Sequence, residues 1–170
     1  CSNEKQLEKF LKKVAHISTD FPSVISKFEV WAKEIEIDGA ALDGKLKIYA
    51  ITEHIENAWV HSWDATVVVP AQKLYIETIR KIKKITKQVI WELGITGPFN
   101  IQFLAKENSI KVIECNVRAS RSFPFVSKVT GYNFIDLATK AIIWKDISGN
   151  YNTLDLDYVW VKAPQFSFHR

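Results

Sequence analysis

The dipeptide Asp43-Gly44 separates two stretches in which polar and apolar residues alternate. Between positions 34 and 38 the acidic residues fall on one face of an extended chain, and the isoleucines fall on the other. Asp-Gly is a strong two-residue hairpin turn. The sequence therefore predicts an antiparallel hairpin that joins a strand at 33–42 to a strand at 45–56.

A second hairpin is predicted from strands at 99–105 and 110–115, with its turn around Glu107-Asn108. Isoleucines at helical spacing predict a long helix over 72–93, which ends at Gly94. The remaining elements are predicted as helices at 4–15, 122–130 and 133–145, strands at 23–28 and 65–69, and an extended end at 158–168. Hairpins mixed with long helices predict an α+β fold with antiparallel pairing.

The composition excludes several classes of protein. The chain has 170 residues, which suits one domain, and no apolar run approaches the roughly 18 residues of a membrane span.

Its net charge of +4 comes largely from lysines on the helix predicted over 72–93. No aromatic residues are interleaved with these lysines, as base stacking would require, so a solvated helix face is favoured over a nucleic-acid site. We expect no nucleic-acid partner and no membrane association.

The two cysteines, Cys1 and Cys115, form neither a disulfide framework nor a metal site, and this predicts a reducing compartment. The chain lacks methionine and begins with Cys1-Ser2-Asn3. We therefore expect it to be a piece of a longer protein.

The densest group of chemically useful residues lies in and after the second hairpin. Glu114 and Asn116 are two residues apart and share a strand face, and a hairpin centred on Asn108 places Gln102 opposite Glu114. One carboxylate and two amide oxygens suit Mg²⁺, and Arg118 and Arg121 follow as possible anion clamps. A polar strand end followed by exposed arginines fits the same spacing, so both interpretations stay open.

Glu34 also has two interpretations. The Glu34-to-Asp38 alternation is typical of a solvated sheet face, but a carboxylate there would also suit the hydroxyls of a ribose. His61-Ser62 lies in a polar loop, where a histidine is more often inert, and the other histidines show no metal-ligand spacing.

Four segments resemble the large chains of carbamoyl-phosphate synthetases. They are EHIENAWVHSWD at 53–64, GPFNIQF at 97–103, VIECNVRASRSFPFVSK at 112–128 and VKAPQFSF at 161–168. The resemblance runs in order along nearly the whole chain. Segment 122–128 resembles the second half of the large chain, which phosphorylates carbamate. The multifunctional pyrimidine-synthesis type is the nearer match, with the mitochondrial urea-cycle type as the alternative.

This resemblance implies a partial ATP-grasp domain, in which two α+β lobes hold ATP between them. Residues 1–64 would be the remainder of the ATP-lid lobe with the nucleotide loop, and residues 65–170 the C-terminal lobe with the metal and phosphate motif. The implied partners are ATP, carbamate or bicarbonate, the remaining synthetase domains and a glutamine amidotransferase domain or subunit. A cytoplasmic location follows for the pyrimidine type, and a mitochondrial one for the alternative.

The resemblance also implies roles for individual residues. Gln102, Glu114 and Asn116 would coordinate Mg²⁺ or Mn²⁺ between the ATP phosphates. Arg118 would contact the transferred phosphoryl group or the carbamate, supported by Arg121. The implied nucleotide contacts are Lys27 and Glu29 beside the adenine, Glu34 at the ribose, and Val60, His61 and Ser62 in a loop over the nucleotide.

The chain departs from the family at its tryptophans. Trp occupies positions where the family has glycine, namely 31, 59, 63, 144 and 160. Glycine is used where φ is positive or where backbone approaches a ligand, so Trp59 and Trp63 are expected to reshape the nucleotide loop or to block it. We expect little turnover from this chain by itself. A non-catalytic domain kept for assembly is an alternative, as is another ATP-grasp ligase such as a biotin-dependent carboxylase.

Overall fold

The computed structural model describes residues 1, 3–15, 24–58, 60, 64–149, 151 and 153–165. Their contacts divide the chain into two units, Cys1–Val30 and Trp31–Arg170. The first unit contains α1 (Glu4–Ala15), which confirms the helix predicted there. The Asn3 side chain begins this helix by accepting a hydrogen bond from the backbone N–H of Gln6 at 3.0 Å. Residues 24–28 form no strand, so that part of the predicted strand is wrong.

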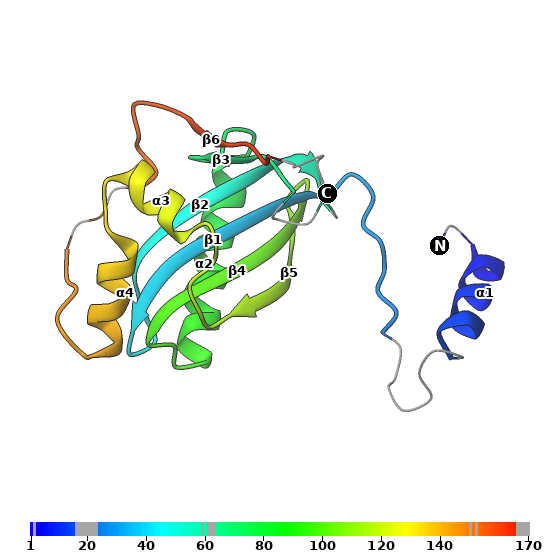
Figure 1. Ribbon diagram of the computed structural model, residues 1–170, viewed down its shortest axis with the longest axis horizontal. Helices are drawn as coiled ribbons and strands as arrows, with labels where there is room; N and C mark the ends of the chain where they lie inside the picture. Colours follow the sequence, from blue (N-terminus) through cyan, green and yellow to red (C-terminus); the bar gives the residue numbers. More distant parts are fainter. Residues whose placement is uncertain are drawn as a thin grey trace. The chain divides into compact units, whose positions relative to one another are not determined.

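The second unit is built on a six-stranded sheet with the order β5-β4-β1-β2-β3-β6, in which every neighbouring pair is antiparallel (Figure 1). The strands are β1 (Lys33–Leu42), β2 (Lys45–Asn57), β3 (Val67–Val69), β4 (Gly97–Lys106), β5 (Ser109–Asn116) and β6 (Trp160–Lys162). Both predicted hairpins and the α+β class are confirmed. The lobe division expected at residue 64 stays a prediction, and the sheet runs across that position.

Helices cover both faces of this sheet (Figure 1). On one face, α2 (Ile76–Glu92) packs Ile82 and Ile90 against the isoleucines of β1 and the phenylalanines of β4. On the other face lie α3 (Phe123–Thr130) and α4 (Phe134–Ile142), whose phenylalanines pack against Ala40 of β1. The amino-terminal half of β1 extends beyond the apolar cluster that α3 and α4 form with Ala40. The polar residues of this half lie on the same face of the sheet as Ala40.

The helix predicted from residue 72 begins four residues later, at Ile76. The carboxylate of Glu53, on β2, accepts hydrogen bonds from the backbone N–H groups of Gln72 and Lys73 at 2.9 and 2.7 Å. Glu53 is buried, and these two bonds hold the preceding segment outside the helix. Within the described residues, no helix has the length and apolar character needed to cross a membrane.

Candidate functional site

The acidic residues of β1 are buried. The exposed fractions of Glu34, Glu36 and Asp38 are 7%, 3% and 0%. The interpretation of this alternation as a solvated sheet face is therefore wrong. Burying ionisable groups is unfavourable unless they find partners, so the contacts of these carboxyls define the chemistry of the face.

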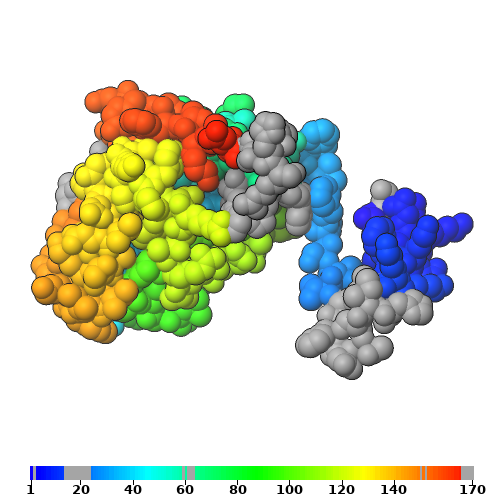
Figure 2. All heavy atoms as spheres, in the orientation of Figure 1, coloured from blue at the N-terminus to red at the C-terminus, as the bar shows by residue number. Residues whose placement is uncertain are grey.

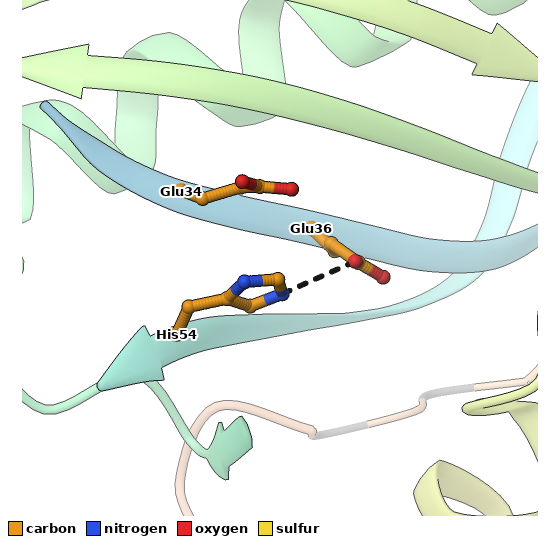
Figure 3. Close-up of side chains that lie close together, drawn as sticks. All are labelled: Glu34, Glu36 and His54. Atoms are coloured by element: carbon orange, nitrogen blue, oxygen red, sulfur yellow. Dashed lines mark hydrogen bonds and ion pairs between the residues drawn. The ribbon is translucent and has the colours of Figure 1, made fainter. Parts of the chain in front are cut away.

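Glu36 is bonded to His54 across the hairpin. His54 lies on β2, is fully buried, and its Nε2 is 3.1 Å from Glu36 Oε1. His54 Nδ1 has no hydrogen-bond partner among the described residues. Figure 3 shows Glu34 and Glu36 on β1, with the Glu36 carboxylate turned toward the His54 ring on the neighbouring strand. One ligand atom from each of these three residues lies within 4.8 Å of the others, an arrangement that suits a cation.

His54 was not predicted from the sequence, because a bulge in β2 determines which face of the sheet its side chain occupies. Near the turn, β1 and β2 pair in the register of a two-residue hairpin, with Ala41 opposite Leu46. The register then shifts, so that Ala40 lies opposite Ile48 and Lys47 is the extra residue. Without this shift His54 would lie on the opposite face from Glu36.

Asn100 connects two of the carboxyls. This residue of β4 is buried, and its Nδ2 donates to Glu36 Oε2 at 3.2 Å and to Asp38 Oδ1 at 3.0 Å. Asp38 Oδ2 has no hydrogen-bond partner in the described part of the chain. The pKa of Asp38 is raised to about 7, chiefly by burial and also by nearby Glu36, against the lowering effects of Ser120, Asn100 and Lys162.

The predicted metal ligands continue this polar face across the sheet. Gln102 of β4 lies opposite Glu36 of β1 on one side and opposite Glu114 of β5 on the other. The expected pairing of Gln102 with Glu114 is therefore confirmed. Asn116 Nδ2 donates to Glu114 Oε1 at 2.7 Å, which leaves the Asn116 carbonyl oxygen outside that bond. A carboxylate and two amide oxygens thus lie together at an exposed strand end, a donor set that fits a hard divalent ion.

A cavity of about 440 Å³ opens beside these ligands. Its lining includes the cations Arg118, Arg121 and Lys162 as well as the polar side chains of Gln102 and Asn116. Arg118 and Arg121 are exposed, and Arg118 Nη1 donates to the backbone carbonyl of Ala119 at 3.2 Å. In Figure 2 the yellow and yellow-green surface and the orange-red surface near residue 160 share one face. Positive groups beside a metal donor set suit an anionic ligand such as a polyphosphate.

The residues expected beside the adenine and in the loop over the nucleotide are only partly described. Lys27 and Glu29 belong to the first unit, where Lys27 Nζ lies 3.9 Å from Glu29 Oε1. Val60 is half-buried. His61 and Ser62, like Trp59 and Trp63, lie outside the described residues.

Two of the tryptophans expected at glycine positions have left-handed backbone. Trp31 has φ 62° and Trp144 has φ 55°. Both side chains are largely exposed, so no core packing explains the rings. Trp160 lies in β6, with about half of its surface exposed. The backbone at positions 31 and 144 is thus of the kind that favours glycine.

Comparison with known proteins agrees with this geometry. The family described as "Carbamoyl-phosphate synthase L chain, ATP binding domain" matches residues 1–143. The chain is 53% identical to "Multifunctional protein URA2" of Saccharomyces cerevisiae over 169 residues, which are 99% of this chain and 8% of that protein. It is 45% identical over 174 residues to human "Carbamoyl-phosphate synthase [ammonia], mitochondrial", again 99% of this chain and 12% of that protein. The chain therefore spans about a tenth of the length of these relatives.

Among solved structures, the biotin carboxylase domain of a thermophilic 2-oxoglutarate carboxylase matches with a TM-score of 0.73 at 15% identity. The match covers 95% of this chain and 37% of that one. Identity this low shows the fold alone, which is the ATP-grasp fold with its antiparallel sheet and flanking helices. The match of the family over residues 1–143 and the 53% identity over almost the whole chain place this protein in the family of carbamoyl-phosphate synthase large-chain ATP-binding domains.

Proposed function

We propose that this chain supplies the metal- and phosphate-binding part of an ATP site that phosphorylates carbamate to carbamoyl phosphate. The observation that carries the proposal is the pairing of Gln102 with Glu114 beside a cavity lined by Arg118, Arg121 and Lys162. Metal ligands beside anion-binding groups are what phosphoryl transfer requires. The similarity to multifunctional URA2 and to the mitochondrial synthase supports carbamate as the acceptor.

In this proposal Gln102, Glu114 and Asn116 hold Mg²⁺ or Mn²⁺ against the ATP phosphates. The ion, when bound, neutralises charge on the β- and γ-phosphates. The bond between Asn116 and Glu114 supports this assignment because it turns the amide group toward the carboxylate and orients both side chains. Glu36 lies opposite Gln102 and is held by His54 and Asn100, which fixes the strand behind the ligands.

The phosphoryl transfer itself is assigned to the arginines. A carbamate oxygen attacks the γ-phosphorus, the bond from that phosphorus to the β,γ-bridging oxygen breaks, and ADP leaves with the electron pair. Arg118 would stabilise the charge on the transferred group, and Arg121 would support it. The exposure of both guanidinium groups at the cavity supports these roles.

The nucleotide contacts complete the proposed site. Glu34 would accept hydrogen bonds from the ribose, and its burial beside Glu36 supports a carboxylate held for a specific partner. Lys27 and Glu29 would lie beside the adenine, and Val60, His61 and Ser62 would cover the nucleotide. The assignments in the loop rest on segment 53–64, which resembles the family.

The proposed partners follow from the relatives. Because the chain covers only a small part of multifunctional relatives, the remaining synthetase domains and a glutamine amidotransferase domain or subunit are expected to accompany it. We also propose a cytoplasmic location, with the mitochondrion as the alternative, because two of the relatives carry "mitochondrial" in their names.

Binding of Mg-ATP to Glu114→Ala tests this function. The full-length wild-type protein should bind Mg-ATP, and the variant should lose that binding while keeping its cooperative unfolding, because Glu114 is exposed. Glu107→Ala, which changes an exposed carboxylate in the turn of the same hairpin, is the matched control. Unchanged binding by the Glu114 variant would overturn the site assignment.

A second candidate is a domain that keeps the fold for assembly without turnover. The left-handed backbone of Trp31 and Trp144 favours it, since these positions have lost the residue that suits them. A flat ATP titration of a wild-type protein that unfolds cooperatively would favour this candidate over the synthetase.

A further inference from the structure

A second cavity, of about 460 Å³, lies on the face of the sheet that α2 covers (Figure 1). Its lining includes Ala105 of β4, which belongs to the apolar cluster beneath α2, and Lys33, which lies opposite Ala105 on β1. Neighbouring residues of a strand point to opposite faces, so Lys33 and Glu34 lie on different sides of the sheet. Among the described residues, this cavity shares no lining residue with the one that contains Arg118 and Arg121.

Two contacts fix the walls of this second cavity. The buried carboxylate of Glu53 accepts hydrogen bonds from the backbone N–H groups of residues 72–73, which holds the segment that leads to Tyr75 outside α2. On the other side, Lys81 of α2 donates to the backbone carbonyl of Asn108 at 3.1 Å and so ties the helix to the β4–β5 turn. The cavity is therefore enclosed by elements that are bonded in place.

The charge of the lining is positive. Lys33, Lys73 and Lys106 line the cavity, and the described lining contains one carboxylate, that of Glu107. Lys33 Nζ donates to the backbone carbonyl of Ile55 at 3.4 Å, which leaves its charge uncompensated. Lys73 and Lys106 are exposed, and neither forms an ion pair within the described part of the chain. Ammonium groups gathered in this way favour an anion such as a phosphate.

Two large aromatic side chains border the same cavity. Trp31 and Tyr75 line it, with 76% and 73% of their surfaces exposed. Trp31 also has left-handed backbone, with φ 62°, and so does Glu107 across the cavity lining, with φ 54°. Strained backbone that packing does not explain is a feature of ligand-binding positions. Exposed rings beside cations suit a flat aromatic group that carries negative charge.

We propose that this cavity is a second ligand site, which binds a free nucleotide with its phosphate at Lys73 and Lys106 and its base stacked on Trp31 and Tyr75. The volume is that of a site for one small ligand. Single-stranded nucleic acid instead needs a positive groove that follows several nucleotides, so a free nucleotide is favoured over a polymer. The proposal is independent of the proposed function, because the two cavities lie on opposite faces of the sheet.

Calorimetric titration of the full-length protein with GMP and with guanosine tests this inference. The titrations contain EDTA, so that no divalent ion can hold a phosphate at Glu114. The wild-type protein should bind GMP more tightly than guanosine. Trp31→Gly should weaken both ligands at least about fivefold, because a stacking ring is lost, and glycine suits the backbone at that position. Lys73→Gln combined with Lys106→Gln should weaken GMP at least about tenfold and leave guanosine unchanged.

Matched controls test the cavity rather than the residue type. Trp144→Gly removes another exposed tryptophan with left-handed backbone, and Lys87→Gln removes an exposed lysine of α2. Neither residue lines the cavity, so both variants should bind GMP as the wild type does. Glu114→Ala should also bind GMP normally, because Glu114 lies on β5 with the metal ligands on the opposite face.

The outcomes separate this site from the proposed ATP site. Absence of GMP binding by the wild-type protein, or equal GMP binding by wild type and Trp31→Gly, overturns the inference and leaves the proposed function untouched. Loss of GMP binding in Glu114→Ala assigns the nucleotide to the ATP site and also overturns the inference. Tighter binding of an oligothymidylate of about twelve nucleotides than of GMP, lost in Trp31→Gly, overturns the free nucleotide in favour of single-stranded nucleic acid.

Discussion

Gln102 lies directly opposite Glu114, although the turn between their strands would by itself place Ile113 there. Lys106 pairs with Ser109 across the two-residue turn, and Phe103 pairs with Val112 in the same register. The register then shifts by one residue, so that Ile113 is extra and Glu114 takes its place opposite Gln102. The bulge thus sets the face on which the carboxylate meets the amide.

Asp38 should make the stability of the protein fall as the pH rises. Its pKa is raised from 3.8 to about 7 in the folded protein, so the folded state binds more protons between these values than the unfolded state. The stabilisation is therefore complete below pH 4 and is lost as the pH rises through 7. A shift of this size corresponds to a loss of the order of 4 kcal/mol at most.

Asp38→Asn removes this ionisation and keeps the acceptor for Asn100. Chemical denaturation at several pH values should give similar free energies of unfolding for both proteins at pH 4, and a more stable variant at pH 8. Parallel curves for the two proteins would contradict the burial argument.

Trp144→Gly should stabilise the protein. α4 ends with hydrogen bonds from Trp144 N–H to the Ala141 carbonyl and from Lys145 N–H to the Lys140 carbonyl. This is the Schellman arrangement, whose left-handed residue is usually glycine, and Trp144 is that residue, with φ 55°. Relief of the strain should raise the free energy of unfolding by about 1 kcal/mol.

Trp91→Gly is the control for this prediction, since Trp91 is equally exposed but lies within α2. There glycine should lower the free energy of unfolding, by up to about 1 kcal/mol, because it is a poor helix former. Thermal melts of both variants test these two predictions. A loss of stability in Trp144→Gly would contradict the claim that the positive φ at position 144 strains the backbone.

Gly39→Ala should be strongly destabilising. A Cβ at Gly39 would lie 2.5 Å from the Ile48 carbonyl oxygen and 2.6 Å from the Phe99 ring. Because both neighbours belong to the central strands, neither can move without disturbing the sheet, and a loss of about 3 kcal/mol is expected. At Gly94 no atom of the described residues, apart from its two chain neighbours, lies within 4 Å of the new Cβ, so Gly94→Ala should lose only about 1 kcal/mol through its positive φ. Equal losses in denaturant titrations would argue against close packing at Gly39.

The fold was largely predictable because its signals are local. The Asp43-Gly44 turn and the alternation beside it predict the β1–β2 hairpin, and the apolar stripe up to Gly94 predicts α2. The start of α2 was not predictable, because Glu53, distant in sequence, binds the backbone of Gln72 and Lys73. Residues 24–28 look like a strand, but propensity alone supplies no pairing partner.

The site was harder to predict than the fold because two bulges decide which residues share its face. The pairing of the predicted metal ligands Gln102 and Glu114 was predicted correctly because a hairpin centred on Asn108 matches the register beyond Ile113. The bulge at Lys47 had no recognisable signal, so His54 was missed. Asp38 and Asn100 were missed because their burial depends on what covers the sheet, which alternation does not reveal.

Nucleotide-dependent Mn²⁺ uptake is the most direct test of the central claim, that Gln102, Glu114 and Asn116 hold the metal of an ATP site. Electron paramagnetic resonance of free Mn²⁺, with AMP-PNP present, should show tight uptake by the full-length wild-type protein and by Glu107→Gln. Glu114→Gln should weaken that uptake at least about tenfold, because a charged ligand is lost. Uptake by Glu114→Gln equal to that of the wild type would contradict the account.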